Sequence, residues 1–261
     1  MQALVRVLNW QEPGRLAAAG PNRAPESLSL YVDERMKGEF KDMEAARLEA
    51  SLDDVIALFR CLSAKDVFEE HYKNATARRL LSGRMPSEDV ERLMISKLKA
   101  ECGAAFTSKL EGMFMDLSKS AIFMEQYHTA RGSSGSSGGA AVHDRRHMAD
   151  FDATVLTSSN WAGSIQAGPV AQLPPPVSAA LADFEAYYGE RFNGRRLTWC
   201  YNKGTAEMRA WIGATSRPYE LLVSTYQMII LYSFNSATEV SYKYVRARTG
   251  TRACGHARVH G

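Results

Sequence analysis

Hydrophobic residues recur at every third or fourth position through the first half of the chain. Such stripes place apolar side chains on one face of an α-helix, so each predicts a helix that packs against a neighbour. Three stripes precede the first break, and they span Leu28–Met36, Leu48–Leu62 and Val67–Leu81. Pro25 is expected to open the first helix, because proline is tolerated in a first turn, where backbone N–H groups have no helical partner.

Punctuating residues divide the next part of the helical region. Residues 83–86 contain glycine and proline and predict a break. Ser87, which is followed by two acids, predicts the start of a helix that ends at Gly103. Ser108–Glu111 has the pattern of a capping box and predicts the start of another helix. Residues 25–130 are therefore expected to form an all-helical bundle.

The period of the pattern changes after a stretch rich in glycine and serine. Residues 131–149 contain the run GSSGSSGG and predict a flexible loop. Beyond it, Phe151, Ala153 and Val155 alternate with polar residues, which is the period of a half-buried β-strand. A proline-rich turn at Pro174–Pro176 then leads into a short helix that carries several aromatic residues.

Three further strand-like runs follow that helix. They span Leu197–Tyr201, Ala206–Ile212 and Tyr219–Val223. Asn202–Gly204 is expected to join the first two as a hairpin turn. Ser224–Gln227 is a second capping box, which predicts the start of an apolar helix. This half is expected to be α+β, with a small antiparallel sheet backed by helices.

The predicted fold class is mainly α with an α+β part, in which a helical bundle precedes a small antiparallel sheet backed by helices. The expected division is an irregular N-terminus at 1–24, a bundle at 25–130, a loop at 131–149, a sheet domain at 151–235 and a C-terminal segment at 236–261.

Composition and charge restrict the possible partners. The chain has 261 residues and a net charge of +3, so its charge does not by itself indicate a nucleic acid or a membrane as partner.

Arg78 and Arg79 end a helical stripe and are interpreted as a solvated helix face, with an acidic partner as the alternative. The last 19 residues carry basic side chains without an acid, which indicates a solvated tail or a phosphate-binding segment. These basic residues are Lys243, Arg246, Arg248, Arg252 and Arg258.

Cellular location follows from the cysteines and from the apolar runs. The four cysteines are widely spaced and form no Cys-x-x-Cys pair, so reduced thiols in a cytoplasmic or nuclear protein are expected. No apolar run approaches the roughly 18 to 20 residues that a membrane span needs. The first ten residues do not have the pattern of a secretory leader.

No residue pattern predicts catalysis or a cofactor. Cys254, His256 and His260 resemble one half of a zinc site, but no second pair of ligands completes it. The histidines have no nucleophile or acid at a spacing typical of a catalytic triad. We therefore expect no metal, no cofactor and no enzymatic activity of the chain's own.

Several dense motifs stand in a fixed order along the chain. They are KDVFEEHYK from Lys65, ARRLL from Ala77, MISKLKAECG from Met94 and FTSKLEGMFMDL from Phe106. In the second half, Phe151–Thr157 with Trp161, Gly194–Trp199 (GRRLTW) and Tyr219–Met228 continue the series. Together they resemble the cullin family, the elongated scaffolds of multisubunit ubiquitin ligases. The resemblance covers residues 22–250, and the run ECGAAFTSKL leans toward the third or fourth cullin subfamily.

This resemblance implies a scaffold that contributes position and no chemistry. A RING-box protein would insert a strand into the sheet, and main-chain hydrogen bonds would provide affinity while alternate side chains set the register. The residues expected at this interface are Val155, Leu156, Thr157, Leu197, Trp199, Tyr201, Leu221 and Val223.

The chain departs from the family pattern at both ends. The helical repeats that hold substrate adaptors are not recognised, so we expect no adaptor binding. The winged-helix region with the lysine that receives a ubiquitin-like modifier is not recognised either. Ser241–Gly250 and Ala253–Val259 resemble parts of a winged helix with a helix missing between them. Residues 236–261 are therefore expected to be a poorly ordered remnant.

The sequence leaves several explanations and several functions open. A truncated gene model, a splice form or a decayed paralogue would each explain the missing parts. The alternative functions are a nucleic-acid or regulatory binding module that uses the basic C-terminal segment, or a truncated cullin without function.

Overall fold

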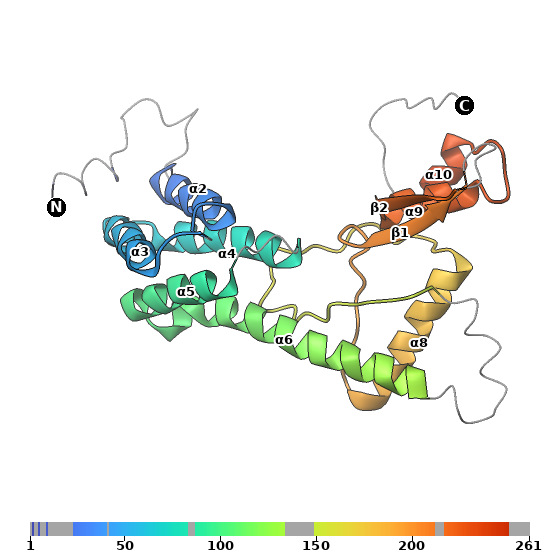
Figure 1. Ribbon diagram of the computed structural model, residues 1–261, viewed down its shortest axis with the longest axis horizontal. Helices are drawn as coiled ribbons and strands as arrows, with labels where there is room; N and C mark the ends of the chain where they lie inside the picture. Colours follow the sequence, from blue (N-terminus) through green and yellow to red (C-terminus); the bar gives the residue numbers. More distant parts are fainter. Residues whose placement is uncertain are drawn as a thin grey trace. The chain divides into compact units, whose positions relative to one another are not determined.

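The structure is a computed structural model that describes residues 2, 5, 9, 23–40, 42–82, 87–133, 149–211 and 217–250. Within these residues the chain forms eight helices and two strands, which confirms the mainly helical fold with a small α+β part (Figure 1). The chain divides into two units. Unit 1 contains residues 1–121 and 154–164, and unit 2 contains residues 122–153 and 165–261.

The helices of unit 1 follow the predicted stripes closely. They are α2 (Arg23–Lys37), α3 (Ala45–Arg60), α4 (Lys65–Leu81), α5 (Glu88–Cys102) and the first part of α6 (Ala104–Ser133). Helix α2 packs on α3 and α4, and α3 packs on α5 (Figure 1). Helix α6 belongs to both units, because the division between them falls inside this continuous helix.

One helix start was predicted correctly and another was wrong. The Ser87 hydroxyl caps α5 by accepting a hydrogen bond from the N–H of Val90. Ser108, by contrast, lies inside α6 and donates to the carbonyl oxygen of Ala105 at 3.0 Å. The reason is Gly103, whose φ of +85° ends α5 and lets α6 begin at the next residue.

Aromatic rings fill the centre of unit 1. The rings of Phe59 and Phe68 lie 5.0 Å apart, and those of Phe68 and Tyr72 are stacked at 5.6 Å. All three side chains are fully buried. They come from α3 and α4, so the motif that begins at Lys65 provides core packing that joins these two helices.

A buried ionic cluster joins α2, α4 and α5. Arg79 is 1% exposed, and its Nε donates to Glu91 Oε1 at 2.5 Å. Its Nη1 forms an ion pair with Asp33, and its Nη2 donates to the hydroxyl of Thr76 at 3.0 Å. The hydroxyl of Tyr72 donates to the other Glu91 oxygen at 3.0 Å. The interpretation of Arg79 as part of a solvated face was therefore wrong, because two carboxylates from other helices neutralise it in the interior.

The cluster shifts the ionisation of its members. Burial alone would raise the pKa of Asp33, but the hydrogen bond from Lys37 and the positive charge of Arg79 outweigh burial and lower this pKa. Burial raises the pKa of Tyr72 well above its ordinary value, and the negative charge of Glu91 adds to the effect. Asp33 therefore stabilises the fold at neutral pH, and its contribution is lost as the pH falls through its lowered pKa.

Unit 2 contains the remaining elements. They are α8 (Pro175–Arg191), β1 (Thr205–Ala210), β2 (Tyr219–Ser224), α9 (Thr225–Ser233) and α10 (Tyr242–Thr249). Strands β1 and β2 pair in antiparallel register, with Ala206 opposite Val223 and Met208 opposite Leu221. The inner face of this hairpin packs on Met228 of α9. Figure 1 shows α9 beside the two strands. Ser224 and Gln227 form the predicted capping box at the start of α9.

The expected hairpin between Leu197–Tyr201 and β1 is absent from the part of the chain that the structure describes. The backbone does turn, with the N–H of Lys203 donating to Cys200 at 2.9 Å, but residues 195–200 join no ladder. The side chain of Asn202 instead accepts from the N–H of Gly168 at 3.2 Å and donates to Gln166 at 3.0 Å. These bonds tie the turn to another loop, so β1 takes β2 as its partner.

Helix α10 lies within the C-terminal segment 236–261, whose poor order stays a prediction. Helix α10 ends at Gly250, which has a φ of +65°, and the carbonyl oxygen of Arg248 accepts from the N–H of Gln172 at 2.8 Å. Arg246 and Arg248 lie in the last turn of α10, where the helix dipole favours positive charge. Residues 251–261, with most of the expected loop and N-terminus, lie outside the described residues.

The buried ionic cluster leads to a testable prediction. Replacing Arg79 by methionine leaves the buried Asp33 and Glu91 carboxylates without their cation. We expect the free energy of unfolding to fall by about 3 to 5 kcal/mol, measured by urea denaturation at pH 7. The matched control is Arg78→Met, which changes the exposed neighbour on the same helix and should alter the midpoint little. Equal midpoints for the two variants would contradict the assigned role of Arg79.

Candidate partner-binding edge

The eight residues predicted for partner binding fall into two groups. Val155, Leu156 and Thr157 lie in unit 1, in an extended stretch that joins no strand ladder among the described residues. The others lie in unit 2. They are Leu197 and Trp199 in an extended stretch, Tyr201 in a turn, and Leu221 and Val223 in β2. The expected strand at 151–155 is thus extended, but it joins no strand ladder among the described residues.

Side chains in unit 2 are largely occupied by packing within that unit. The indole N–H of Trp199 donates to Glu185 at 2.5 Å, and its ring lies 5.9 Å from that of Phe151. Tyr201 and Val223 pack on the cluster that contains Met228. These side chains support the hairpin and its helix, so their role in partner binding stays a prediction.

The extended stretch in unit 1 is held from one side by α6. We call residues 154–158 the edge segment. The N–H of Val155 donates to the hydroxyl oxygen of Ser120 at 2.7 Å, and the N–H of Thr157 donates to Asp116 Oδ2 at 3.0 Å. The Thr157 hydroxyl donates to Asp116 Oδ1 at 2.8 Å. Two alternate backbone N–H groups are therefore satisfied by helix side chains and not by a neighbouring strand.

Asp116 also holds the chain that follows the edge segment. Its Oδ2 accepts from Asn160 Nδ2 at 3.1 Å and from the indole N–H of Trp161 at 2.9 Å. Trp161 is 2% exposed. Burial alone would raise the pKa of Asp116, but the hydrogen bonds from Thr157, Asn160 and Trp161 outweigh burial and lower this pKa. The carboxylate is thus ionised at neutral pH and serves as a multiple acceptor.

The opposite edge of the edge segment carries the backbone groups of Thr154 and Leu156. Successive residues of an extended chain direct their N–H groups to opposite edges. Thr154 and Leu156 therefore face away from the edge that α6 occupies, and neither forms a backbone hydrogen bond within the described residues. Thr154 is exposed and Leu156 is half-buried. An extended backbone with one satisfied edge and one free edge is a template for an added strand.

Asp116 and Ser120 were not predicted from the sequence. Both lie in the motif that begins at Phe106, and the spacing of four residues places them on the same face of α6. Asp116 is 9% exposed and Ser120 is 4% exposed. Two polar residues on a buried helix face indicate a polar partner, and this signal was available from the helical period.

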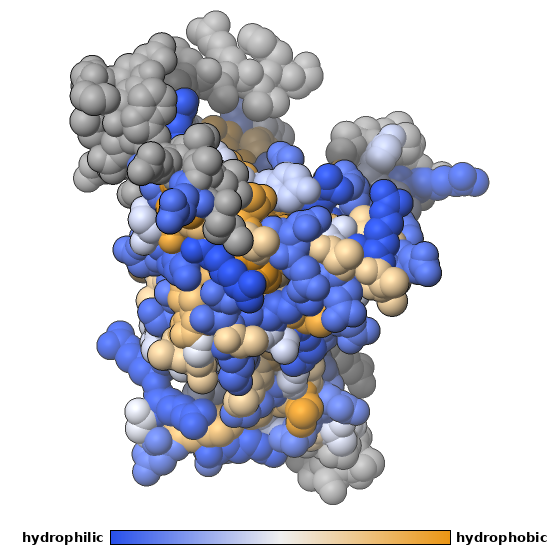
Figure 2. Space-filling model, turned by 90° about the vertical axis from the view of Figure 1, so that its left-hand side faces the viewer, coloured by the Kyte–Doolittle hydropathy of each residue, from blue (hydrophilic) through white to orange (hydrophobic). Residues whose placement is uncertain are grey.

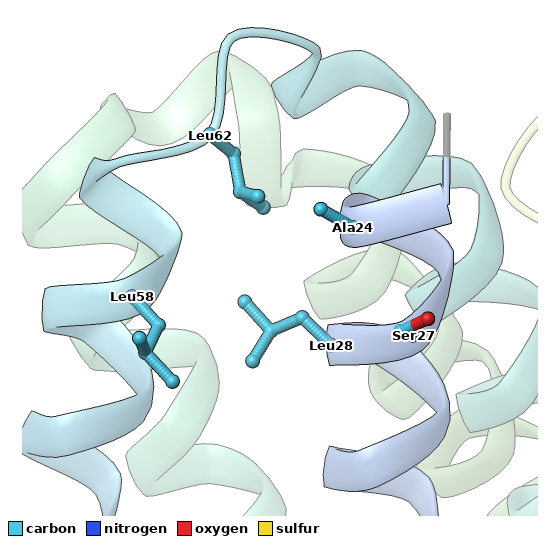
Figure 3. A pocket seen from close by; sticks show the side chains of 5 residues that line it. All are labelled: Ala24, Ser27, Leu28, Leu58 and Leu62. Atoms are coloured by element: carbon cyan, nitrogen blue, oxygen red, sulfur yellow. The ribbon is translucent and has the colours of Figure 1, made fainter. Parts of the chain in front are cut away.

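A pocket in unit 1 is lined mainly by apolar side chains and by no charged one. It lies between α2 and α3, has a volume of about 210 Å³, and is lined by Ala24, Ser27, Leu28, Leu58 and Leu62. Figure 3 shows the three leucine side chains directed into this space and the Ser27 hydroxyl directed away from it. Ligand sites usually combine an apolar lining with a few convergent polar groups.

Figure 2 shows hydrophobic residues confined to limited areas of a largely hydrophilic face.

No group of three or more His, Cys, Asp or Glu side chains among the described residues could hold a metal ion, and Cys254, His256 and His260 lie outside these residues. Cys61, Cys102 and Cys200 carry thiol groups. None of the helices within the described ranges is both long enough and apolar enough to cross a membrane.

Comparison with known proteins identifies the architecture. Residues 2–124 match the cullin alpha solenoid domain, and residues 155–254 match the cullin alpha+beta domain. Cullin-3A of Arabidopsis thaliana is 40% identical over 227 residues, which are 87% of this chain and 29% of the relative. Cullin-3 of Dictyostelium discoideum is 39% identical over 230 residues, which are 87% of this chain and 28% of the relative.

A more distant relative extends the match. Cullin-4A of Homo sapiens is 33% identical over 258 residues, which are 92% of this chain and 31% of the relative. A helical solenoid segment followed by an α+β segment is thus the two-part arrangement of one family of proteins. The chain belongs to the cullin family. It spans 28% to 31% of the length of these curated relatives.

The geometry at Asp116 predicts a measurable loss of stability on substitution. Asp116→Ala leaves the indole N–H of Trp161 and the N–H of Thr157 without an acceptor. We expect a loss of about 1.5 to 3 kcal/mol in the free energy of unfolding at pH 7, because the lost bonds are to a charged group. The contribution is complete at neutral pH and is lost as the pH falls through the lowered pKa of Asp116.

A matched control uses a more exposed carboxylate. Asp183 pairs with Arg131, and these two side chains are 26% and 29% exposed. Asp183 also accepts from the Tyr127 hydroxyl at 2.9 Å, but it receives fewer hydrogen bonds than Asp116 does. Asp183→Ala should therefore cost less, about 1 kcal/mol or below. Urea denaturation of both variants measures the difference, and an equal or larger effect at Asp183 would contradict the importance of Asp116.

Proposed function

We propose that this chain is a non-catalytic scaffold segment of a cullin-RING ubiquitin ligase, and that a RING-box protein binds it by adding a strand to the edge segment. Family membership supports the scaffold role. The edge at Thr154 and Leu156 is the observation that carries the binding mode, because its extended backbone forms no backbone hydrogen bond within the described residues. In this role the chain positions its partners relative to one another, and the partners carry out ubiquitin transfer.

The edge segment is preferred over the hairpin because side chains of α6 fix its register from one side. Strands β1 and β2 pair with one another over their whole length, so each of them also keeps one edge without a strand among the described residues. The edge segment has helix side chains on one side and no strand on either side among the described residues. Strand addition there would satisfy backbone groups that now have no protein partner, which is the main source of affinity in this binding mode.

A proline substitution tests the proposed edge. Leu156→Pro removes the N–H that faces away from α6 while keeping an extended conformation accessible. We expect the full chain to co-elute with a purified RING-box protein and the Leu156→Pro variant to bind about tenfold more weakly. Isothermal titration calorimetry gives the affinities, and thermal denaturation shows whether the variant folds.

The control places proline in the other extended stretch. Thr198 is exposed and lies in residues 195–200, which also join no ladder. Thr198→Pro should leave the affinity within about twofold. A wild-type chain that does not bind the RING-box protein would contradict the proposed function. Loss of binding only in Thr198→Pro would instead place the added strand in unit 2.

A further inference from the structure

We infer that a stripe on α6, formed by Gly112, Asp116 and Ser120, substitutes for a β-strand and positions the edge segment so that only its outer edge can accept a partner strand. This inference rests on the proposed function for the identity of the partner. It assigns positioning roles to residues that would not touch the partner themselves.

The spacing of the stripe matches the spacing of a strand edge. Residues four apart in an α-helix are separated by about 6 Å along its axis, since each residue rises about 1.5 Å. Residues two apart in a strand are separated by about 6.6 Å. Asp116 and Ser120 therefore present acceptor oxygens at nearly the interval at which Thr157 and Val155 present N–H groups. Side chains of the helix thus accept hydrogen bonds from alternate backbone N–H groups, as the carbonyl groups of a neighbouring strand would.

Gly112 extends the stripe by one further turn of α6. A Cβ atom at this position would lie 2.5 Å from Asn160 Nδ2 and 2.6 Å from Asn160 Cγ. The side chain of Asn160 thus occupies the space beside Gly112, and a side chain at position 112 would displace it. The same Asn160 donates to Asp116 at 3.1 Å, so the close approach and the acceptor act on one residue.

The stripe selects one register for the edge segment. A shift of one residue would turn Val155 and Thr157 outward and bring Thr154 and Leu156 against α6. Such a shift would separate the Thr157 hydroxyl and the Trp161 indole from Asp116, to which both now donate. Two backbone bonds and three side-chain bonds from Thr157, Asn160 and Trp161 therefore oppose slippage, and the outer edge presents a fixed set of donors and acceptors.

Amide hydrogen exchange tests the stripe without any partner. In the full chain, we expect the amides of Val155 and Thr157 to be protected and those of Thr154 and Leu156 to exchange faster. Ser120→Ala should accelerate exchange at Val155 by about 3- to 10-fold, as expected for the loss of one hydrogen bond. Equal exchange at all four amides in the wild-type chain would overturn the inference.

Binding measurements test the positioning role itself. Ser120→Ala should weaken RING-box binding by about 3- to 10-fold, and Ser120→Thr, which keeps the hydroxyl, should restore it. Gly112→Ala should weaken binding as well, because it displaces Asn160. The control is Ser118→Ala, since the Ser118 hydroxyl donates to the carbonyl oxygen of Phe114 within α6 at 3.1 Å and does not contact the edge segment.

The outcomes separate the two proposals. Alternating amide protection in a wild-type chain that fails to bind the RING-box protein would overturn the proposed partner and support the stripe as a positioning device. Normal RING-box affinity in both Ser120→Ala and Gly112→Ala, with folding verified by circular dichroism, would overturn the stripe while leaving the partner supported.

Discussion

One buried carboxylate, Asp116, holds the returning part of the chain on unit 1. This unit is discontinuous in sequence, because residues 154–164 return to helices formed by residues before 122. A returning chain must satisfy its backbone groups wherever it is buried. Asp116 does so for Thr157 and also accepts from the side chains of Asn160 and Trp161. The edge segment is extended for this reason, although no strand lies beside it among the described residues.

The buried cluster around Arg79 solves a related problem within the helical part. Removing charges from water costs free energy, which is recovered only when each charge is paired and hydrogen-bonded. Arg79 meets this condition with Asp33 of α2 and Glu91 of α5, while Tyr72 and Thr76 provide further polar contacts. Apolar packing alone would tolerate many offsets between these helices. Directional bonds among three helices restrict them to one arrangement.

These two polar constraints suit a protein whose proposed role is to hold other proteins in position. A scaffold transmits geometry only if its elements keep fixed relations to their neighbours, so directional bonds inside each unit matter more than reactive groups. The cullin relatives match both the solenoid and the α+β parts, and the chain spans less than a third of their length. The proposed partner contact uses backbone groups, which leaves side chains free to support the fold.

The sequence by itself determined the elements whose causes are local. The helical stripes, the serine cap at Ser87, the capping box at Ser224 and the stop at Gly103 were all predictable, since each depends on residues within a few positions. The family was recognisable because its motifs are dense and ordered. Alternation in β1 and β2 likewise predicted the two strands that form the ladder.

Tertiary structure decided which extended segments find partners and where charges are buried. Period-two alternation at 151–157 and 197–201 indicates an extended backbone. It does not determine which element forms hydrogen bonds with the backbone groups of these segments. Asp116 provides such a bond for the first segment, and the bonds of Asn202 divert the second from β1. From the sequence alone, Arg79 has the charge of a typical surface residue. In the structure it is buried because carboxylates from two other helices pair with it. These outcomes depend on contacts between residues far apart in the chain, which local pattern cannot specify.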